Sequence, residues 1–368
     1  RNLFAGDPRS VPTRSAHAQW VKLAEELIRR HLQDQGDYPR GLVVDLWGSA
    51  TMRTAGEEIS MALHLAGLKT RWDEGSERVS GVEIVPLTLL GRPRIDVTLR
   101  VSGLFRDVFP GLAQLFETGA AALAEREEAA DMNPYGVRTP RVFGPKPGLY
   151  GMNMEAAMLD YSDAGRSAAG EAWLRASEWA IDAKGEVHQD RAALEDRLGQ
   201  TDGFAHVQDL MESDVLLSSD YASHEGGFAA AMAHLGAAMP ALYHIDSATP
   251  DRPRARSMAE EIARVVRGRA ANPDWARGMM RHGFRGAAEV AATLDNLAAF
   301  AHLTRDVPGH LFDLYYDATL GRADLVDFME RENPDALAAM RDRFSAVREA
   351  GLWVTRRNSI LSQMAAAE

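Results

Sequence analysis

Apolar positions recur along the first part of the chain with two spacings, one typical of helices and one typical of buried strands. Residues 16–35 carry Trp20, Leu23, Leu27 and Leu32 near a 3.6-residue period, which predicts an amphipathic helix. The compact apolar run GLVVDLW at 41–47 predicts a buried strand. A Gly-Ser step follows it, and a helix is expected from Met52 to Leu65. A strand that leads directly into a helix indicates βαβ organisation.

The alternation of strands and helices continues to residue 126. Strands are expected near 69–72, at 82–87 (VEIVPL) and at 94–101 (RIDVTLRV), and a helix is expected at 109–126. This order predicts an α/β fold with a parallel sheet covered by helices, Rossmann- or flavodoxin-like, whose ligands lie beyond the carboxyl ends of the strands. We therefore assign residues 1–126 to an α/β domain.

The periodicity is lost in the middle of the chain and returns near its end. The Gly- and Pro-rich stretch at 133–153 also carries aromatic residues, so we interpret it as an ordered, functional loop. A helix is expected at 171–181, followed by a strand, helix, strand unit made of DGFAHVQDL, a helix at 227–235 and PALYHID. We assign 127–250 to this loop-rich region and 251–368 to a mainly helical region.

Composition excludes several classes of function. The 368 residues are 46% hydrophobic and carry a net charge of −12, which disfavours binding to nucleic acid. No apolar run is long enough for a membrane span, so we expect no membrane contact and a cytoplasmic location. Cysteine is absent, and any metal must be held by imidazole or carboxylate. The sequence also lacks a Walker phosphate loop, so we expect that ATP is not bound or hydrolysed by this chain.

Three clusters of polar residues lie at predicted strand ends and helix starts. Glu57 begins a helix, where its carboxylate also suits the helix dipole. Arg106 and Asp107 follow a predicted strand. The pair fits either a ligand site or a structural ion pair. The stretch 206–225 includes Asp209 and Asp220 among other imidazole and carboxylate donors, which suit a divalent cation but are also common in solvated loops.

A fourth cluster surrounds the segment RHGFRGAAEV at 281–290. Trp275 lies in NPDW at a predicted helix start, and Glu289 lies in the first turn of the next helix. Between them, His282 is either a cation at a helix end or a general base oriented by Glu289 across a glycine-containing turn. The residues alone leave both interpretations open.

Four long motifs identify a family resemblance in collinear order: DLWGSATMRTAGEEI (45–59), GRPRIDVTLRVSGLFRD (91–107), RVFGPKPGLYG (141–151) and NPDWARGMMRHGFRGAAEV (272–290). Together they resemble the large subunit of aerobic cobaltochelatase and, less closely, the large H-type chain of magnesium chelatase. Members are much longer, so the resemblance implies that this chain is the C-terminal part of such a protein. It implies a nitrogen–metal ligase that inserts cobalt(II) into hydrogenobyrinic acid a,c-diamide in cobalamin biosynthesis. It further implies that partner AAA+ subunits use the ATP, and the chain alone is expected to be inactive.

The resemblance also implies that particular residues belong to the site of metal insertion. Insertion requires groups that strip water from the cation and bases that take two pyrrolic protons. We predict His282 and Glu289 as catalytic residues, Arg106 and Trp275 as tetrapyrrole-binding residues, and Glu57, Asp209 and Asp220 as metal-handling carboxylates. Two functions other than cobalt insertion stay open. The chain is then either a scaffold that docks the AAA+ subunits or part of a magnesium chelatase H-type protein that inserts magnesium into protoporphyrin IX.

Overall fold

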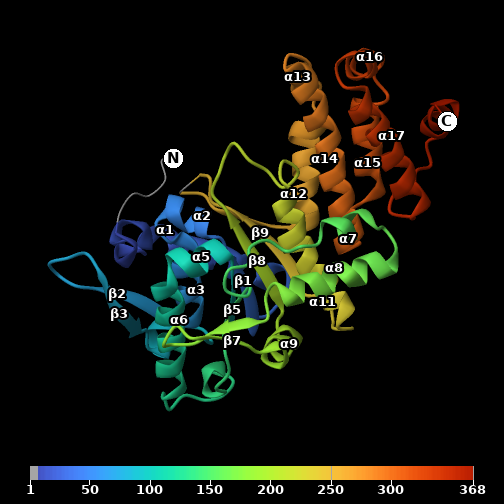
Figure 1. Ribbon diagram of the computed structural model, residues 1–368. Coiled ribbons are helices and arrows are strands. Elements are labelled where there is room, and N and C mark those ends of the chain that lie inside the picture. Colours follow the sequence, from blue (N-terminus) through green and yellow to red (C-terminus); the bar gives the residue numbers. More distant parts are fainter. Residues whose placement is uncertain (1–6, 250, 368) are drawn as a thin grey trace. The chain divides into compact units, whose positions relative to one another are not determined.

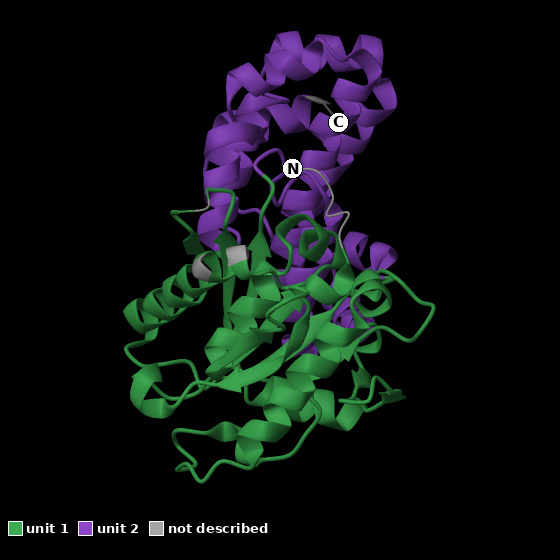
Figure 2. Cartoon of the chain, turned by 90° about the vertical axis from the view of Figure 1, so that its left-hand side faces the viewer, with its two compact units in different colours: residues 1–153, 174–210, 235–257 green, residues 154–173, 211–234, 258–368 purple. Residues whose placement is uncertain are grey.

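The chain folds into two compact units, each built from separated stretches of sequence. The computed structural model describes residues 7–249 and 251–367. The sheet unit comprises residues 1–153, 174–210 and 235–257, and the helical unit comprises 154–173, 211–234 and 258–368 (Figure 2). The predicted boundaries near 126 and 250 do not coincide with this division, because residues 127–250 contribute to both units.

An eight-stranded sheet forms the centre of the sheet unit (Figure 1). Its strands, in spatial order, are β10 (Arg254–Ser257), β9 (Ala241–Asp246), β8 (Gly203–Gln208), β1 (Gly41–Leu46), β4 (Asp96–Val101), β5 (Val142–Gly144), β6 (Trp179–Ile181) and β7 (Val187–Gln189). The five from β9 to β5 are parallel, and antiparallel strands complete both edges. The chain leaves β1 for β4 on one side and later returns to β8 on the other. This is the doubly wound order, with its switch point between β1 and β8, and it confirms the predicted fold class.

Short connections and helices surround this sheet. The helical segments of the sheet unit are η1 (Pro8–Ser10), α1 (Arg14–Gln35), α2 (Gly48–Thr54), α3 (Glu57–Ala66), α4 (Leu87–Leu90), α5 (Gly103–Val108), α6 (Pro110–Ala124), η2 (Pro134–Gly136) and α9 (Arg191–Gly199). The helix predicted at 52–65 is divided in two, because Ala55 and Gly56 have φ angles of 58° and 92° that no helix accommodates.

Two predicted strands do not join the main sheet. β2 (Leu68–Trp72) and β3 (Val79–Ile84) pair with each other in an antiparallel hairpin. Only six residues connect them, and a parallel crossover needs a dozen or more. The prediction that they belong to the parallel sheet was therefore wrong.

One face of the central strands is apolar and the other is not. In β1, Leu42, Val44 and Leu46 join a core formed with α1, α3 and α6. Because successive side chains of a strand point to opposite faces, Val43 and Asp45 lie on the other side of the sheet. Every residue of β1 is nevertheless buried. The second face of the sheet therefore buries charge.

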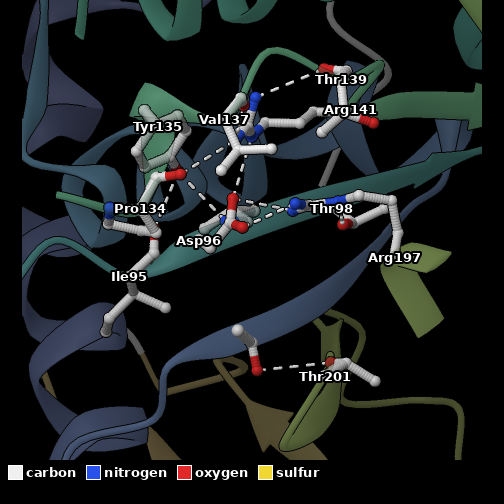
Figure 3. A network of polar contacts seen from close by, with 12 residues as sticks. Ile95, Asp96, Thr98, Pro134, Tyr135, Val137, Thr139, Arg141, Arg197 and Thr201 are labelled. Carbon is white, nitrogen blue, oxygen red and sulfur yellow. Dashed lines mark hydrogen bonds and ion pairs between the residues drawn. The ribbon is translucent and has the colours of Figure 1, made fainter. Parts of the chain in front are cut away.

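At the amino end of β4 this charge is neutralised within the sheet unit (Figure 3). Arg197 donates to the Asp96 carboxylate from Nη1 at 2.6 Å and from Nη2 at 2.8 Å, and Arg141 donates from Nε at 2.9 Å. Arg141 also lies over the ring of Tyr135, 4.5 Å from its centroid. Asp96 is 9% exposed, so two guanidiniums satisfy one buried carboxylate. These contacts join α9, β4 and the segment after η2, and we assign them a structural role.

The helical unit contains the remaining elements. They are α7 (Glu155–Leu159), α10 (Ser219–Tyr221), the π-helical turn η3 (Ala222–Gly226), α11 (Gly227–His234), α12 (Met258–Val265), the π-helical turn η4 (Val266–Ala270), α13 (Pro273–Met280), α14 (Gly283–Thr304), α15 (Gly309–Ala318), α16 (Ala323–Glu332), α17 (Pro334–Glu349) and α18 (Asn358–Ala367). Trp353 is fully buried among Phe312, Tyr316 and Phe344, and its Nε1 donates to Asp313 at 2.8 Å. The predicted mainly helical C-terminal region is confirmed.

The helix predicted at 171–181 was placed too late. The structure has α8 at Asp163–Arg175, which contributes residues to both units, and the apolar Trp179–Ile181 forms the strand β6. A short apolar run does not distinguish a helix end from an edge strand. In the described ranges 7–249 and 251–367, no helix has the length and apolarity needed to cross a bilayer.

Candidate functional site

Four polar side chains lie side by side across four neighbouring strands, and we call them the polar row. Strand register pairs Asp45 with Arg100 of β4 and with His206 of β8, and it pairs His206 with His244 of β9. All four are 2% exposed or less. Arg100 Nη1 lies 3.8 Å from Asp45 Oδ1, and His206 Nδ1 lies 3.2 Å from Asp45 Oδ2. The row thus lines up a guanidinium, a carboxylate and two imidazoles inside the sheet.

Neighbouring side chains fix the polar row at its middle and at its β9 end. Trp47 donates from Nε1 to Asp45 Oδ2 at 2.6 Å, and its ring centroid lies 4.5 Å from that of His206. At the β9 end, His244 Nε2 lies 2.7 Å from Gln208 Oε1. Because Asp45 Oδ2 accepts from the indole, the His206 contact fits a ring that carries a proton on Nδ1. Burial lowers the pKa of Arg100 to about 10, and nearby Asp45 opposes this shift.

Of these four residues, only His206 falls in a stretch that was selected from the sequence, 206–225. Asp45 is the one charged residue in the apolar run of β1, and this is the signal that was available, whereas β4, β8 and β9 carry further polar residues. The four positions are joined only by the strand register, which the sequence does not contain.

The predicted carboxylates Glu57 and Asp209 lie near one another at the carboxyl edge of the sheet. Arg53 binds Asp209 with two hydrogen bonds of 2.9 Å, which join α2 to the end of β8 at the switch point. Burial, together with the charges of Glu57 and Asp209, raises the pKa of the neighbouring Glu58 to about 8. This edge therefore brings Glu57, Glu58 and Asp209 near one another, and Arg53 pairs with Asp209.

Asp220 lies elsewhere. It is an exposed residue of α10 in the helical unit, whereas Glu57 and Asp209 belong to the sheet unit. Within residues 7–249 and 251–367, no group of three or more His, Asp and Glu side chains has the arrangement of a metal site. A metal-handling role for these three carboxylates stays a prediction.

Arg106 has partners within the protein. Its Nη1 donates to the carbonyl oxygens of Pro145 and Lys146 at 2.8 and 3.0 Å, and its Nε donates to Asp107 at 2.7 Å. The side chain is 7% exposed. In this structure Arg106 anchors a loop, and contact with a ring carboxylate stays a prediction.

Three of the predicted residues line one cavity in the helical unit. It has a volume of about 490 Å³ and is lined by Trp275, His282 and Glu289 together with Glu212, Leu217, Arg269, Met279, Arg285 and Gly286. His282 is exposed between the end of α13 and the start of α14, whereas Trp275 and Glu289 are half-buried. The volume lies in the range of small-molecule sites. The structure thus brings together an indole, an imidazole and a carboxylate that were selected from the sequence.

The cavity wall is held by an ion pair. Asp214 accepts from Arg269 Nε at 2.5 Å and from its Nη2 at 3.0 Å. The guanidinium carbon of Arg269 lies 4.7 Å from the ring centroid of Trp275. Since Asp214 is itself buried and also accepts from the backbone of Leu216 at 2.9 Å, it fixes the arginine against the indole. Trp275 therefore has a defined orientation in the cavity wall.

Gly286 determines how closely α13 and α14 approach one another. A Cβ atom at this position would lie 1.8 Å from the carbonyl oxygen of Met279. Only glycine allows α14 to begin directly against the end of α13. This close turn places His282 and Glu289 on the same cavity as Trp275.

Comparison with known proteins agrees with these motifs. The family model described as CobN/magnesium chelatase matches residues 1–360. The chain is 42% identical to the aerobic cobaltochelatase subunit CobN of Sinorhizobium sp, with 99% of this chain and 30% of that protein covered. It is 25% identical to the H-type large chain of the magnesium chelatase of Cereibacter sphaeroides, with 100% and 32% covered.

A solved structure shares the fold. The catalytic subunit of cobaltochelatase from Mycobacterium tuberculosis superposes with a TM-score of 0.92 at 31% identity, covering 98% of this chain and 32% of that one. The chain thus spans about 30% of the length of the curated relatives it matches. On the family match and these identities, the chain belongs to the CobN/magnesium chelatase family.

Proposed function

We propose that this chain takes part in inserting cobalt(II) into a tetrapyrrole, as part of the large subunit of an ATP-dependent chelatase. The macrocycle in this proposal is hydrogenobyrinic acid a,c-diamide. One observation carries the proposal: in a chain of this family, Trp275, His282 and Glu289 line a single cavity.

Relative similarity supports cobalt over magnesium. The chain is 42% and 40% identical to two cobaltochelatase subunits, and 24% and 25% identical to two magnesium-chelatase chains of the H type. Hydrolysis of ATP is assigned in this proposal to separate AAA+ subunits, since the sequence has no phosphate loop.

The cavity offers groups suited to the chemistry of insertion. A neutral imidazole at His282 and a carboxylate at Glu289 can each accept a pyrrolic proton as the metal enters. The indole of Trp275, held by Arg269, offers an apolar face to a flat ring. Arg285 supplies a guanidinium for a carboxylate on the ring's periphery.

A spectroscopic titration tests this assignment. The complete subunit is titrated with hydrogenobyrinic acid a,c-diamide and, in parallel, with protoporphyrin IX, and the absorption spectrum of each ligand is followed. We expect a saturable shift with the first ligand, weakened by Trp275→Ala and unchanged by the control Trp72→Ala in the β2–β3 hairpin. An unaltered spectrum at saturating protein would contradict the proposal.

An exposed aromatic beside the cavity favours a second function, docking of the ATPase subunits. Phe284 follows His282 by two residues and is 66% exposed. Replacing it by serine distinguishes the two functions. Loss of co-purification with the ATPase subunits and normal tetrapyrrole binding would show docking, whereas weakened tetrapyrrole binding would place Phe284 in the ligand site.

A further inference from the structure

The helical unit contains another cavity, formed by residues of α15, α16, α17 and α18 and of the turn after α15. Its volume is about 340 Å³, which lies in the range of small-molecule sites. None of its lining residues belongs to the cavity that contains Trp275. The proposed function therefore does not use it, and we call it the α17 cavity.

One face of α17 forms a wall of the α17 cavity. Ala338, Arg341, Asp342 and Ser345 all line it, and their spacing of three, four and seven residues places them on the same side of the helix. The two charged residues lie in the middle of this face, and the two small residues lie at its ends. The small side chains leave room for a ligand beside the charges.

Neither charged residue of this wall has a partner within the protein. In the ranges 7–249 and 251–367, Arg341 and Asp342 form no ion pair and no side-chain hydrogen bond. The adjacent Arg343, in contrast, donates to Asp295 at 2.9 Å. A guanidinium suits a carboxylate and a carboxylate suits an ammonium group, so this wall fits a ligand that carries both charges.

A tyrosine hydroxyl in the same cavity also lacks a partner. Tyr316 is 3% exposed, and its ring packs 5.2 Å from that of Phe344 and 5.9 Å from that of Trp353, measured between centroids. Among the described residues, no group shares a hydrogen bond with its hydroxyl. Burial raises the pKa of Tyr316 and the charge of Arg341 opposes the shift, so the guanidinium lies near the phenol. A polar group that is left without a partner in the interior is costly, and a ligand in the cavity supplies one.

The other walls of the α17 cavity are largely apolar. Leu320 after α15, Val326 of α16 and Met364 of α18 line it, and Met364 is 7% exposed. These side chains favour an apolar body on the ligand, because contact with it removes apolar surface from water.

We infer that the α17 cavity binds a free α-amino acid with a large apolar side chain, a function separate from tetrapyrrole binding. The ligand's carboxylate accepts hydrogen bonds from Arg341 and from the hydroxyl of Tyr316, which lie near one another. Its ammonium group donates to Asp342. A hydrocarbon would leave all three polar groups without partners, and a ligand with a single charge would leave Arg341 or Asp342 unpaired.

Calorimetric titration of the complete subunit tests the ligand class. L-Phenylalanine and L-leucine are titrated in parallel with phenylalaninamide, which lacks the carboxylate, and N-acetylphenylalanine, which lacks the ammonium group. We expect saturable binding of at least one of the two free amino acids and roughly tenfold weaker binding of each phenylalanine derivative than of phenylalanine. If neither free amino acid binds at millimolar concentrations, or if the derivatives bind as well as phenylalanine, the inference is wrong.

Substitutions on α17 assign the two charges. Arg341→Gln should weaken phenylalanine binding roughly tenfold without changing the affinity for phenylalaninamide, and Asp342→Asn should do the same with respect to N-acetylphenylalanine. Tyr316→Phe should weaken phenylalanine binding about threefold. The control is Arg348→Gln, because Arg348 belongs to the same helix but does not line the cavity.

Two results would overturn this placement of the amino acid. One is equal affinity of Arg341→Gln and Arg348→Gln for phenylalanine. The other is loss of binding in Trp275→Ala with normal binding in Arg341→Gln, which would place the amino acid in the other cavity. Because neither readout involves a tetrapyrrole, failure of the proposed function leaves this inference intact, and the reverse also holds.

Discussion

Nδ1 of His206 lies 3.2 Å from Oδ2 of Asp45, across the boundary between the neighbouring parallel strands β8 and β1. This boundary is the switch point of the sheet. The pair continues to Arg100 on one side and to His244 on the other, so titratable groups run across the centre of the fold. They are buried in the interior, and their charges must balance locally.

The first prediction concerns this balance. Asp45→Asn removes the carboxylate that opposes the buried Arg100, so we expect unfolding to become easier by about 3 kcal/mol. Urea unfolding measures the change. The double variant Asp45→Asn with Arg100→Met should recover part of the loss, because no unopposed charge then stays buried. A single variant as stable as the unmodified chain would show that Asp45 does not neutralise Arg100.

The second prediction concerns the pH dependence of stability. Burial raises the pKa of Glu58 from 4.5 to about 8, and in the described residues its Oε1 has no hydrogen-bond partner. The folded chain therefore holds this proton to higher pH than the unfolded chain. Its stabilising contribution is complete below about pH 4.5 and is lost as the pH rises toward 8.

Glu58→Gln should remove this dependence. Between pH 5 and 8, the unfolding free energy of the unmodified chain should fall relative to the variant by about 1.4 kcal/mol per pH unit. Urea unfolding at pH 5, 6.5 and 8 measures both slopes, with the exposed Glu186→Gln as the control. Parallel slopes for Glu58→Gln and the unmodified chain would refute the raised pKa.

The third prediction compares two glycines of adjacent helices. Gly286→Ala places a methyl group against the Met279 carbonyl, so we expect a loss of roughly 2–3 kcal/mol in unfolding free energy. Gly278→Ala in α13 meets open space and should stabilise the chain by up to about 1 kcal/mol. Thermal unfolding distinguishes them. Similar effects of the two substitutions would mean that α13 and α14 do not approach closely at Gly286.

The helices and strands that could be predicted are those marked by the spacing of apolar residues within a single segment. The apolar spacing of 16–35 and the run at 41–47 correspond to α1 and β1, and the two runs near 203 and 241 correspond to β8 and β9. The β2–β3 hairpin was misplaced, although the predicted strands at 69–72 and 82–87 are separated only by residues 73–81, which is too short for a parallel crossover. A hairpin could have been predicted from that separation.

The candidate site could be predicted only where its residues lie close together in the sequence. Trp275, His282 and Glu289 follow one another at intervals of seven residues, on α13, at the turn and on α14, so the sequence already places them near each other. Asp45, Arg100, His206 and His244 lie on four strands that are far apart in the sequence. Their alignment depends on register, which is set by the packing of the whole sheet.

The central claim is that His282 and Glu289 act in metal insertion. It is tested most directly by the single-turnover rate of cobalt insertion by the complete chelatase carrying His282→Ala and Glu289→Gln, with the exposed His188→Ala as control. We expect insertion to slow by at least about 100-fold, while tetrapyrrole affinity and assembly with the ATPase subunits stay at the level of the control. An insertion rate equal to that of the control would contradict the account.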